Sequence, residues 1–374
     1  MRSRTYASSE EHNSRVLDDP RVRSQLDPKG MLHLVETFGG QCREAIQIAG
    51  FYDAGVRRGP IRSVVVTGLG GSAIGGDMLR SVVAPHCDVP IVVNRDYTLP
   101  GFVGPDTLVL AVSYSGNTEE TLSAYTVARQ RRAHVVCITS GGELWRRAEA
   151  DRVPAIRVPA GPPPRAATGY LFFPMVHVLE HSGVLEHSLA GDAEETAGLL
   201  EELAAEWGPD VELEVNPAKK VAASLFRRVP VIYGTLDYAG VAALRWKTQI
   251  NENAKSHAFA GAFPEMNHNE ILAWQEPSRQ ARRWTVVYLR DADEESTTPR
   301  IARRVAVTRR LIGRKVPQID VHSRGRSLMA RLFSLMYFGD FTSCYLALLY
   351  REDPTVIPGI DRLKAELSRL KVPL

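Results

Sequence analysis

Apolar and polar residues alternate along the chain in blocks whose lengths indicate strands and helices in turn. Residues 62–83 begin with an apolar run, continue through a glycine-rich turn and end with helical spacing. The same order recurs at 107–133, and shorter apolar runs lie at 89–94, 134–140 and 155–159. Strands that alternate with helices favour parallel sheets built from βαβ units. Because these strands are apolar throughout, helices are expected on both faces of the sheet.

The second half of the chain repeats this opening. Residues 228–254 are predicted to begin with a strand, continue through a turn of small residues and end with an amphipathic helix. Further strands are expected within 282–294 and 315–325, and the strongly apolar segment 328–350 is interpreted as a pair of helices. The predicted fold class is therefore α/β, with two doubly wound, mostly parallel sheets flanked by helices.

Length and local composition indicate how the chain is divided into domains. With 374 residues it is long enough for two domains. Residues 1–27 are polar, and we interpret them as an N-terminal extension whose first dozen residues are poorly ordered. The first domain is assigned to 28–208 and the second to 215–358, with a C-terminal helix over 359–374. We expect the active site to lie between the domains and the terminal helix to return to it.

Charge and cysteine content argue against several classes of protein. The chain has 46 basic and 43 acidic residues, so this near balance gives no reason to expect a nucleic-acid partner. Four distant cysteines without CxxC spacing argue against a zinc site or a disulfide framework. The N-terminus shows no signal-peptide pattern, and Pro174 and charged residues interrupt the apolar stretch 169–185. We therefore expect a cytoplasmic protein with no membrane partner.

Small polar residues crowd the turn after one of the predicted strands. The sequence SYSGNT at 113–118 places Ser113, Ser115 and Thr118 at the start of a helix. Ligands of open α/β sheets bind outside the carboxyl ends of the strands, where helix N-termini favour anions. One residue is enough to cap a helix, whereas three hydroxyls can hold the oxygens of a phosphate. We predict a phosphate site; the alternative is a capping box that starts at Ser115 or Asn117.

The glycine-rich turn GLGGSA at 68–73 supports a rival interpretation. It matches the dinucleotide fingerprint G-x-G-x-x-A, and Arg95 could meet the 2′-phosphate of NADP. However, Gly75 and Gly76 loosen the helix start that would meet a pyrophosphate, and a second phosphate site at 113–118 would be superfluous. The turn fits a small phosphorylated substrate better, and an NADP-dependent oxidoreductase remains the weaker alternative.

Seven motifs together resemble a known family. GLGGSAIGGD, SYSGNTEET and CITSGGEL resemble a sugar isomerase (SIS) domain. Four further motifs are similar to those of one family, the bifunctional phosphoglucose/phosphomannose isomerases: PPPRAATGY, RWKTQINENAK, EMNHNEILAW and DPTVIPGIDRLK. The resemblance covers nearly the whole chain. It implies two SIS domains in a homodimer with active sites near the interface. It also implies interconversion of glucose 6-phosphate, fructose 6-phosphate and mannose 6-phosphate without a cofactor or metal. A non-catalytic sugar-phosphate-binding SIS regulator is the main alternative.

The resemblance also implies roles for individual residues. Arg165 would lie near the reacting carbons, Glu252 would be the base, His268 would open the sugar ring and Lys364 would lie beside it. Thr355 would be linked to acceptance of the mannose epimer. The residues expected to bind substrate are Gly70, Gly71, Ser72, Ser113, Ser115, Thr118 and Thr355.

The chemistry of the reaction is consistent with these roles. Interconversion of an aldose and a ketose moves a proton between adjacent carbons through an enediol, so one carboxylate, Glu252, suffices. Arg165 keeps its charge and can stabilise the enediolate oxygen. His268 can exchange protons near neutral pH during ring opening. Because the enediol is planar at C2, protonation from either face gives the glucose or the mannose configuration.

Overall fold

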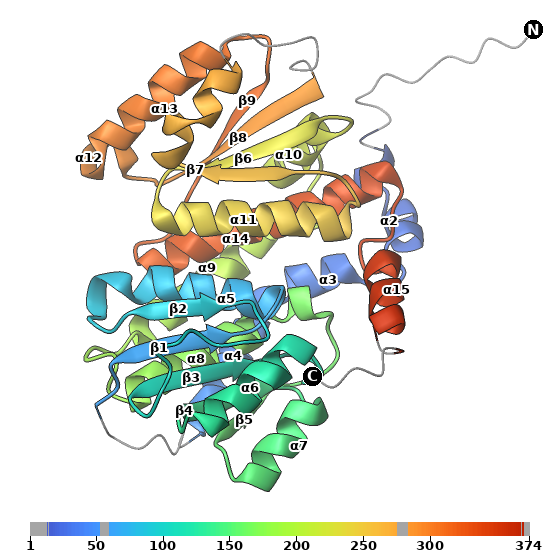
Figure 1. Ribbon diagram of the computed structural model, residues 1–374. Coiled ribbons are helices and arrows are strands. Elements are labelled where there is room, and N and C mark those ends of the chain that lie inside the picture. Colours follow the sequence, from blue (N-terminus) through green and yellow to red (C-terminus); the bar gives the residue numbers. More distant parts are fainter. Residues whose placement is uncertain (1–12, 14, 53–59, 275–282, 368, 370–374) are drawn as a thin grey trace, which may run out of the picture. The chain divides into compact units, whose positions relative to one another are not determined.

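The computed structural model describes residues 13, 15–52, 60–274, 283–367 and 369, which divide into two compact units (Figure 1). The N-terminal unit contains the described parts of 38–198, with 327–329 and 369, and the C-terminal unit contains those of 1–37, 199–326 and 330–368. The first dozen residues, which we expected to be poorly ordered, lie outside the described part of the chain.

Five parallel strands form the sheet of the N-terminal unit, in the order β2-β1-β3-β4-β5. The central strand β3 is buried along its whole length, as expected for a strand covered on both faces. Helices α6 and α7 cover one face, and α5 and α8, with α4 packed on α8, cover the other (Figure 1). The strands are β1 (Ser63–Thr67), β2 (Ile91–Asn94), β3 (Thr107–Val112), β4 (His134–Thr139) and β5 (Ala155–Arg157). The helices are α4 (Phe38–Gly50), α5 (Gly71–Val83), η1 (Ala84–His86), α6 (Glu119–Gln130), α7 (Gly142–Asp151), η2 (Pro164–Ala166) and α8 (Thr168–His181).

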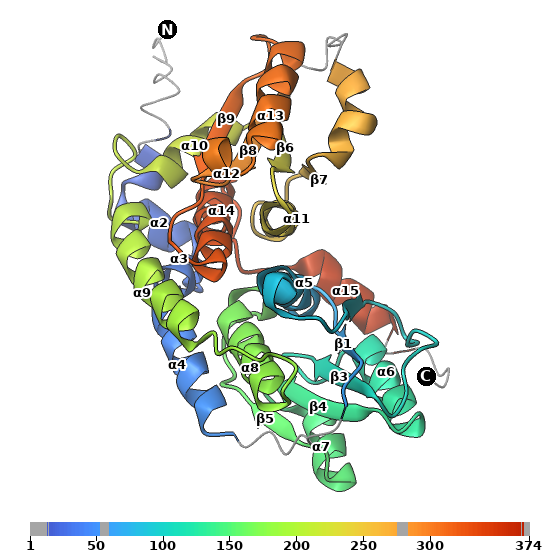
Figure 2. The same ribbon diagram turned by 90° about the vertical axis from the view of Figure 1, so that its left-hand side faces the viewer.

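The C-terminal unit contains a four-stranded parallel sheet in the order β7-β6-β8-β9. This is the order of the first four strands of the other sheet, as expected for a duplicated architecture. Helix α13 packs on one face and α11 on the other, with α14 against α11 (Figure 2). The strands are β6 (Val229–Gly234), β7 (Phe259–Ala262), β8 (Trp284–Arg290) and β9 (Gln318–His322). The remaining helices are α2 (Pro20–Leu26), α3 (Met31–Glu36), α9 (Ala190–Trp207), α10 (Pro217–Leu225), α11 (Asp237–Asn253), η3 (Glu265–His268), η4 (Glu270–Trp274), α12 (Glu294–Thr297), α13 (Pro299–Ile312), α14 (Leu328–Tyr350) and α15 (Pro358–Leu367).

The predicted fold class is confirmed, since both sheets are parallel, doubly wound and flanked by helices. In each sheet the strand order reverses between the first strand and the third. Ligands of such sheets bind beside this switch point, at the carboxyl ends of the strands. In the N-terminal unit, the turns at the switch point are 68–70 and 113–118, which are the two turns that the sequence singles out.

The prediction of a helix pair over 328–350 is wrong, because α14 is one continuous helix. A Cβ on Gly339 would lie 2.3 Å from the Trp246 ring of α11, so this glycine serves close packing of two helices rather than a break. Among the described residues, α14 is the one helix long and apolar enough to cross a membrane. Its most apolar window is completely buried, which is typical of a core helix.

Candidate active site

The turn after β3 presents hydroxyl groups at the start of α6. The hydroxyls of Ser113 and Thr118 lie 2.9 Å apart, and Thr118 occupies the N-cap position without a side-chain capping hydrogen bond. The Ser115 hydroxyl accepts a hydrogen bond from the Asn117 backbone at 3.3 Å. The Asn117 side-chain oxygen accepts one from the Glu143 backbone at 3.0 Å. Neither Ser115 nor Asn117 caps α6, so the simple capping alternative does not describe this turn, which has the features of an anion site.

This turn, which we call the serine cradle (113–118), is supported by the turn after β4. Gly116 has a φ of 69°, and a Cβ on it would lie 1.8 Å from the carbonyl oxygen of Gly141. A Cβ on Gly142 would lie 2.4 Å from the Ser115 carbonyl oxygen. The Tyr114 hydroxyl donates to the Pro159 carbonyl at 2.9 Å, and burial raises the pKa of Tyr114 to about 12. Sequence reasoning assigned no role to Gly141 and Gly142, although two glycines directly after a strand were an available signal.

Arg165 lies against the glycine-rich turn after β1. A Cβ on Gly71 would lie 2.9 Å from the Pro164 carbonyl oxygen and 3.5 Å from the Arg165 Cα, so the glycine permits this approach. Arg165 is only 4% exposed. Ser72, the residue after Gly71, is buried, and its hydroxyl makes no hydrogen bond with another described residue. Gly70 caps α5 with a φ of 53°.

The glycine turn also adjoins the serine cradle. A Cβ on Gly68 would lie 2.8 Å from the Val112 carbonyl oxygen at the end of β3. The structure therefore places the seven predicted residues of the N-terminal unit at one edge of its sheet. These are Gly70, Gly71, Ser72, Ser113, Ser115, Thr118 and Arg165.

Arg95, which the dinucleotide alternative assigns to a 2′-phosphate, forms an ion pair with Asp77 of α5. The pair already neutralises this guanidinium within the chain. The geometry at the end of β2 therefore gives no support to an NADP site.

Glu252 lies in the last turn of α11 and is half-buried. Lys255, just after the helix, donates to the Asn253 carbonyl at 2.9 Å and also to the Asp353 carbonyl. The Asp353 carboxylate accepts a hydrogen bond from the Thr355 backbone at 2.7 Å. The structure thus joins the end of α11 to the loop that contains Thr355. Sequence reasoning did not single out Lys255 or Asp353, because they are 98 positions apart.

His268 is exposed at the end of η3, in a segment held by side-chain hydrogen bonds. The Tyr233 hydroxyl donates to Glu270 at 2.9 Å and accepts from the Trp274 indole at 3.1 Å, and burial raises the pKa of Tyr233. Within one chain His268 does not lie beside Glu252. Helix α11 ends near the amino end of β7 (Figure 1). His268, at the end of η3, follows the carboxyl end of this strand along the chain.

Lys364 is exposed on α15, a helix without buried residues. It forms no hydrogen bond or ion pair with another described residue. The structure therefore does not bring Lys364 into contact with either Glu252 or His268.

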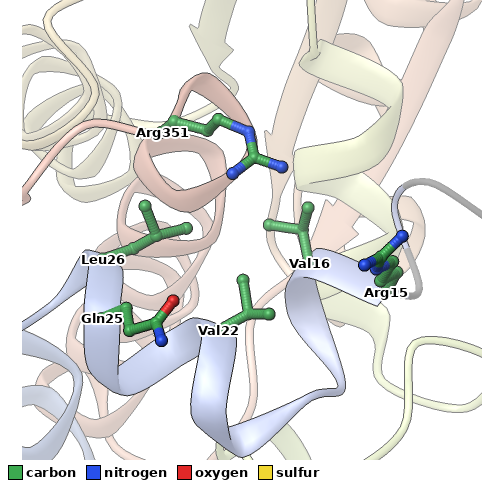
Figure 3. Close-up of a pocket in the computed structure, with 6 residues that line it drawn as sticks. All are labelled: Arg15, Val16, Val22, Gln25, Leu26 and Arg351. Atoms are coloured by element: carbon green, nitrogen blue, oxygen red, sulfur yellow. The ribbon is translucent and has the colours of Figure 1, made fainter.

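A pocket of about 320 Å³ lies beside α2 in the C-terminal unit (Figure 3). Its lining contains none of the predicted site residues, so it is separate from the candidate active site. The lining residues are Arg15, Val16, Val22, Gln25, Leu26 and Arg351.

Two parallel sheets of one strand order, with a serine cradle at the switch point of the first, define a protein built from two SIS-type domains. Comparisons with known proteins agree. Residues 60–165 match the SIS domain family, and residues 214–367 match the bacterial phospho-glucose isomerase C-terminal SIS domain. The chain is also similar, with a TM-score of 0.72 and 16% identity, to the crystal structure of a hypothetical protein from Thermus thermophilus, over 96% of this chain and 94% of that one. At this identity the likeness concerns the fold alone.

Two curated relatives define the family more closely. The bifunctional phosphoglucose/phosphomannose isomerase of Caldicellulosiruptor bescii is 42% identical over 91% of this chain and 100% of its own length. The protein of the same name from Thermoplasma acidophilum is 38% identical over 85% of this chain and 93% of its own. The chain belongs to the bifunctional phosphoglucose/phosphomannose isomerase family.

Proposed function

We propose that this protein is an isomerase that interconverts glucose 6-phosphate, fructose 6-phosphate and mannose 6-phosphate by proton transfer through an enediol. The observation that carries the proposal is the 42% identity to a bifunctional isomerase along that relative's full length. The uncapped start of α6 beside three hydroxyls supports a substrate with a phosphate group.

In this proposal the N-terminal unit binds the substrate. The hydroxyls of Ser113, Ser115 and Thr118 and the first amides of α6 hold the phosphate. Three residues of the glycine-rich turn lie along the sugar: Gly70, Gly71 and Ser72. Arg165, permanently charged and almost fully buried, stabilises the negative charge that develops on the enediolate oxygen.

The C-terminal unit supplies the groups that move protons. Glu252 takes the proton from one carbon and returns it to the next, and His268 opens the ring with Lys364 beside it. Thr355, joined to the end of α11 through Lys255, takes part in accepting the mannose epimer. Because a carboxylate alone can shuttle the proton, the route requires no metal or cofactor.

Conversion of fructose 6-phosphate into both aldoses tests this function. We expect glucose 6-phosphate and mannose 6-phosphate to form at rates unaffected by EDTA. In D₂O, deuterium should be incorporated at C2 of both products, because the base exchanges its proton with solvent during enediol formation. Binding of the sugar phosphate without turnover would favour the SIS regulator instead. Loss of activity in EDTA would contradict the metal-free route.

We further propose a cytoplasmic homodimer in which His268 acts on the substrate of the partner's Glu252. The position of Glu252 and His268 at opposite ends of β7 supports this arrangement. A closed twofold pair would give each site one of each residue.

Mixed dimers of two inactive variants test the exchange. If His268 acts in trans, a dimer of one Glu252→Gln and one His268→Ala chain has one intact site and one doubly altered site. Random co-assembly should then restore about a quarter of wild-type specific activity, since about half of the dimers are mixed and each has one working site. If His268 acts in cis, every site lacks one residue and the mixture stays inactive, which would contradict the exchange.

A further inference from the structure

A row of buried polar contacts joins α11 to α14. The Arg245 guanidinium donates to both carboxylate oxygens of Asp340, at 3.2 Å through Nε and 2.9 Å through Nη2. Gln249 donates to Asp340 Oδ1 at 2.9 Å, and Asn253 donates to Ser343 Oγ at 2.9 Å. The side chains of Arg245 and Asp340 are only 3% and 6% exposed. We call these five residues the α11–α14 polar ladder.

The ladder lies on the face of α11 that ends beside Glu252. Its three members on α11, Arg245, Gln249 and Asn253, recur every fourth residue and so share one face of the helix. Asn253 is the immediate neighbour of Glu252. Because a helix turns and rises as a rigid element, a slip of α11 by one turn would displace the Glu252 carboxylate by about 5.4 Å.

Stability alone does not account for charged residues at this place. Removing a guanidinium and a carboxylate from water costs several kcal/mol per ion, and a well-packed apolar pair of similar volume is commonly as stable. A bidentate Arg–carboxylate pair differs from an apolar contact in accepting one geometry only. The neighbouring contact of Trp246 with Gly339 is close, but the ladder's directional bonds specify the rotation of α11 and its position along its axis.

We propose that the α11–α14 polar ladder, centred on Arg245 and Asp340, is a set of positioning residues that holds α11 in the register at which Glu252 meets the substrate carbon. This inference rests on the proposed function, in which Glu252 moves the proton. The ladder acts on Glu252 through geometry rather than through charge, because Arg245 and Asp340 neutralise each other.

The test replaces both charges, and the glutamine that donates to Asp340, with apolar side chains in Arg245→Met/Gln249→Leu/Asp340→Leu, so that the buried Gln249 amide is not left without its acceptor. We expect the Tm to stay the same or rise, the Kd for inorganic phosphate to stay the same, and kcat to fall by about 100-fold, since a displacement of about 1 Å has this effect on catalysis. Gln249→Met, which keeps the ion pair, should lower kcat by less. The pH dependence of kcat should keep its midpoints, because the mechanism leaves the charge around Glu252 unchanged.

A control removes another ion pair of the same unit, in which the lysine side chain is fully buried and the aspartate partly exposed. Lys219 of α10 donates to Asp18 at 2.9 Å and to the Pro209 carbonyl at 2.8 Å, and none of these three residues belongs to α11. Lys219→Met/Asp18→Asn should leave kcat unchanged. An apolar variant of the ladder with wild-type kcat would overturn the inference, and so would a loss of kcat that occurs equally in the control or only together with a lower Tm. Glu252→Gln separates the two hypotheses: if it stays active, the proposed role of Glu252 fails, whereas if it is inactive and the ladder variant is active, only the ladder fails.

Discussion

Replacement of Glu252 by glutamine is expected to lower kcat by about 10²–10⁴-fold in all three sugar interconversions, the range that a positioned general base contributes. Glutamine preserves the size of the side chain and its hydrogen-bonding reach, but its amide cannot accept and return a proton. KM should stay within a few-fold of wild type, since the proposed function assigns the phosphate to the serine cradle of the other unit rather than to α11.

The measurement combines steady-state kinetics with proton exchange. Deuterium incorporation at C2 from D₂O should fall in parallel with kcat, because both depend on enediol formation. Glu214→Gln, an exposed carboxylate of the same unit, is the matched control and should leave both rates unchanged. Retention of most of the activity by Glu252→Gln would assign the proton transfer to another residue.

The second large effect is expected at Arg165. Arg165→Met should lower kcat by about 10²–10³-fold, as the loss of one group that stabilises an oxyanion commonly does. Methionine keeps much of the apolar stem of this buried side chain, but it removes the fixed positive charge that the proposed function places beside the developing enediolate. The kcat of Arg165→Lys should lie between those of the wild type and Arg165→Met, because lysine keeps a positive charge but lacks the planar guanidinium group.

Affinity for inorganic phosphate distinguishes this role from simple phosphate binding. In Arg165→Met the phosphate Kd should stay close to wild type, since the serine cradle is intact, while kcat falls. A phosphate Kd that rises with kcat unchanged would instead make Arg165 a phosphate ligand. An unchanged thermal unfolding transition would show that the buried substitution has not disturbed the unit.

Local features of the sequence were sufficient to predict the repeated order of strands and helices. The run from Ser63 to Thr67, the glycines after it and the helical spacing over 71–83 are all short-range signals, and each is found in the structure. Local pattern failed over 328–350, where it predicted two helices and the structure has one; within this helix, Gly339 leaves room for the Trp246 ring of α11. It also gave no indication of β7, a four-residue edge strand of Phe, Ala and Gly.

The same distinction applies to the candidate site. The serine cradle was predictable because Ser113, Ser115 and Thr118 belong to one strand–helix turn. Tertiary structure alone decided that Gly141 supports this cradle and that Arg165 lies on the turn of Gly71. These contacts depend on the order of strands in the sheet, which hydrophobic periodicity does not encode.

The sequence by itself therefore determined the fold class, the family and the residue types available for chemistry, because these depend on contiguous motifs. Only the tertiary structure decided which side chains support one another. It joins Lys255 to Asp353, pairs Arg245 with Asp340 and separates Glu252 from His268 by the length of β7. Such relations arise from the packing of segments about 90 or more residues apart, or from the course of the chain across a sheet, and a one-dimensional pattern contains neither.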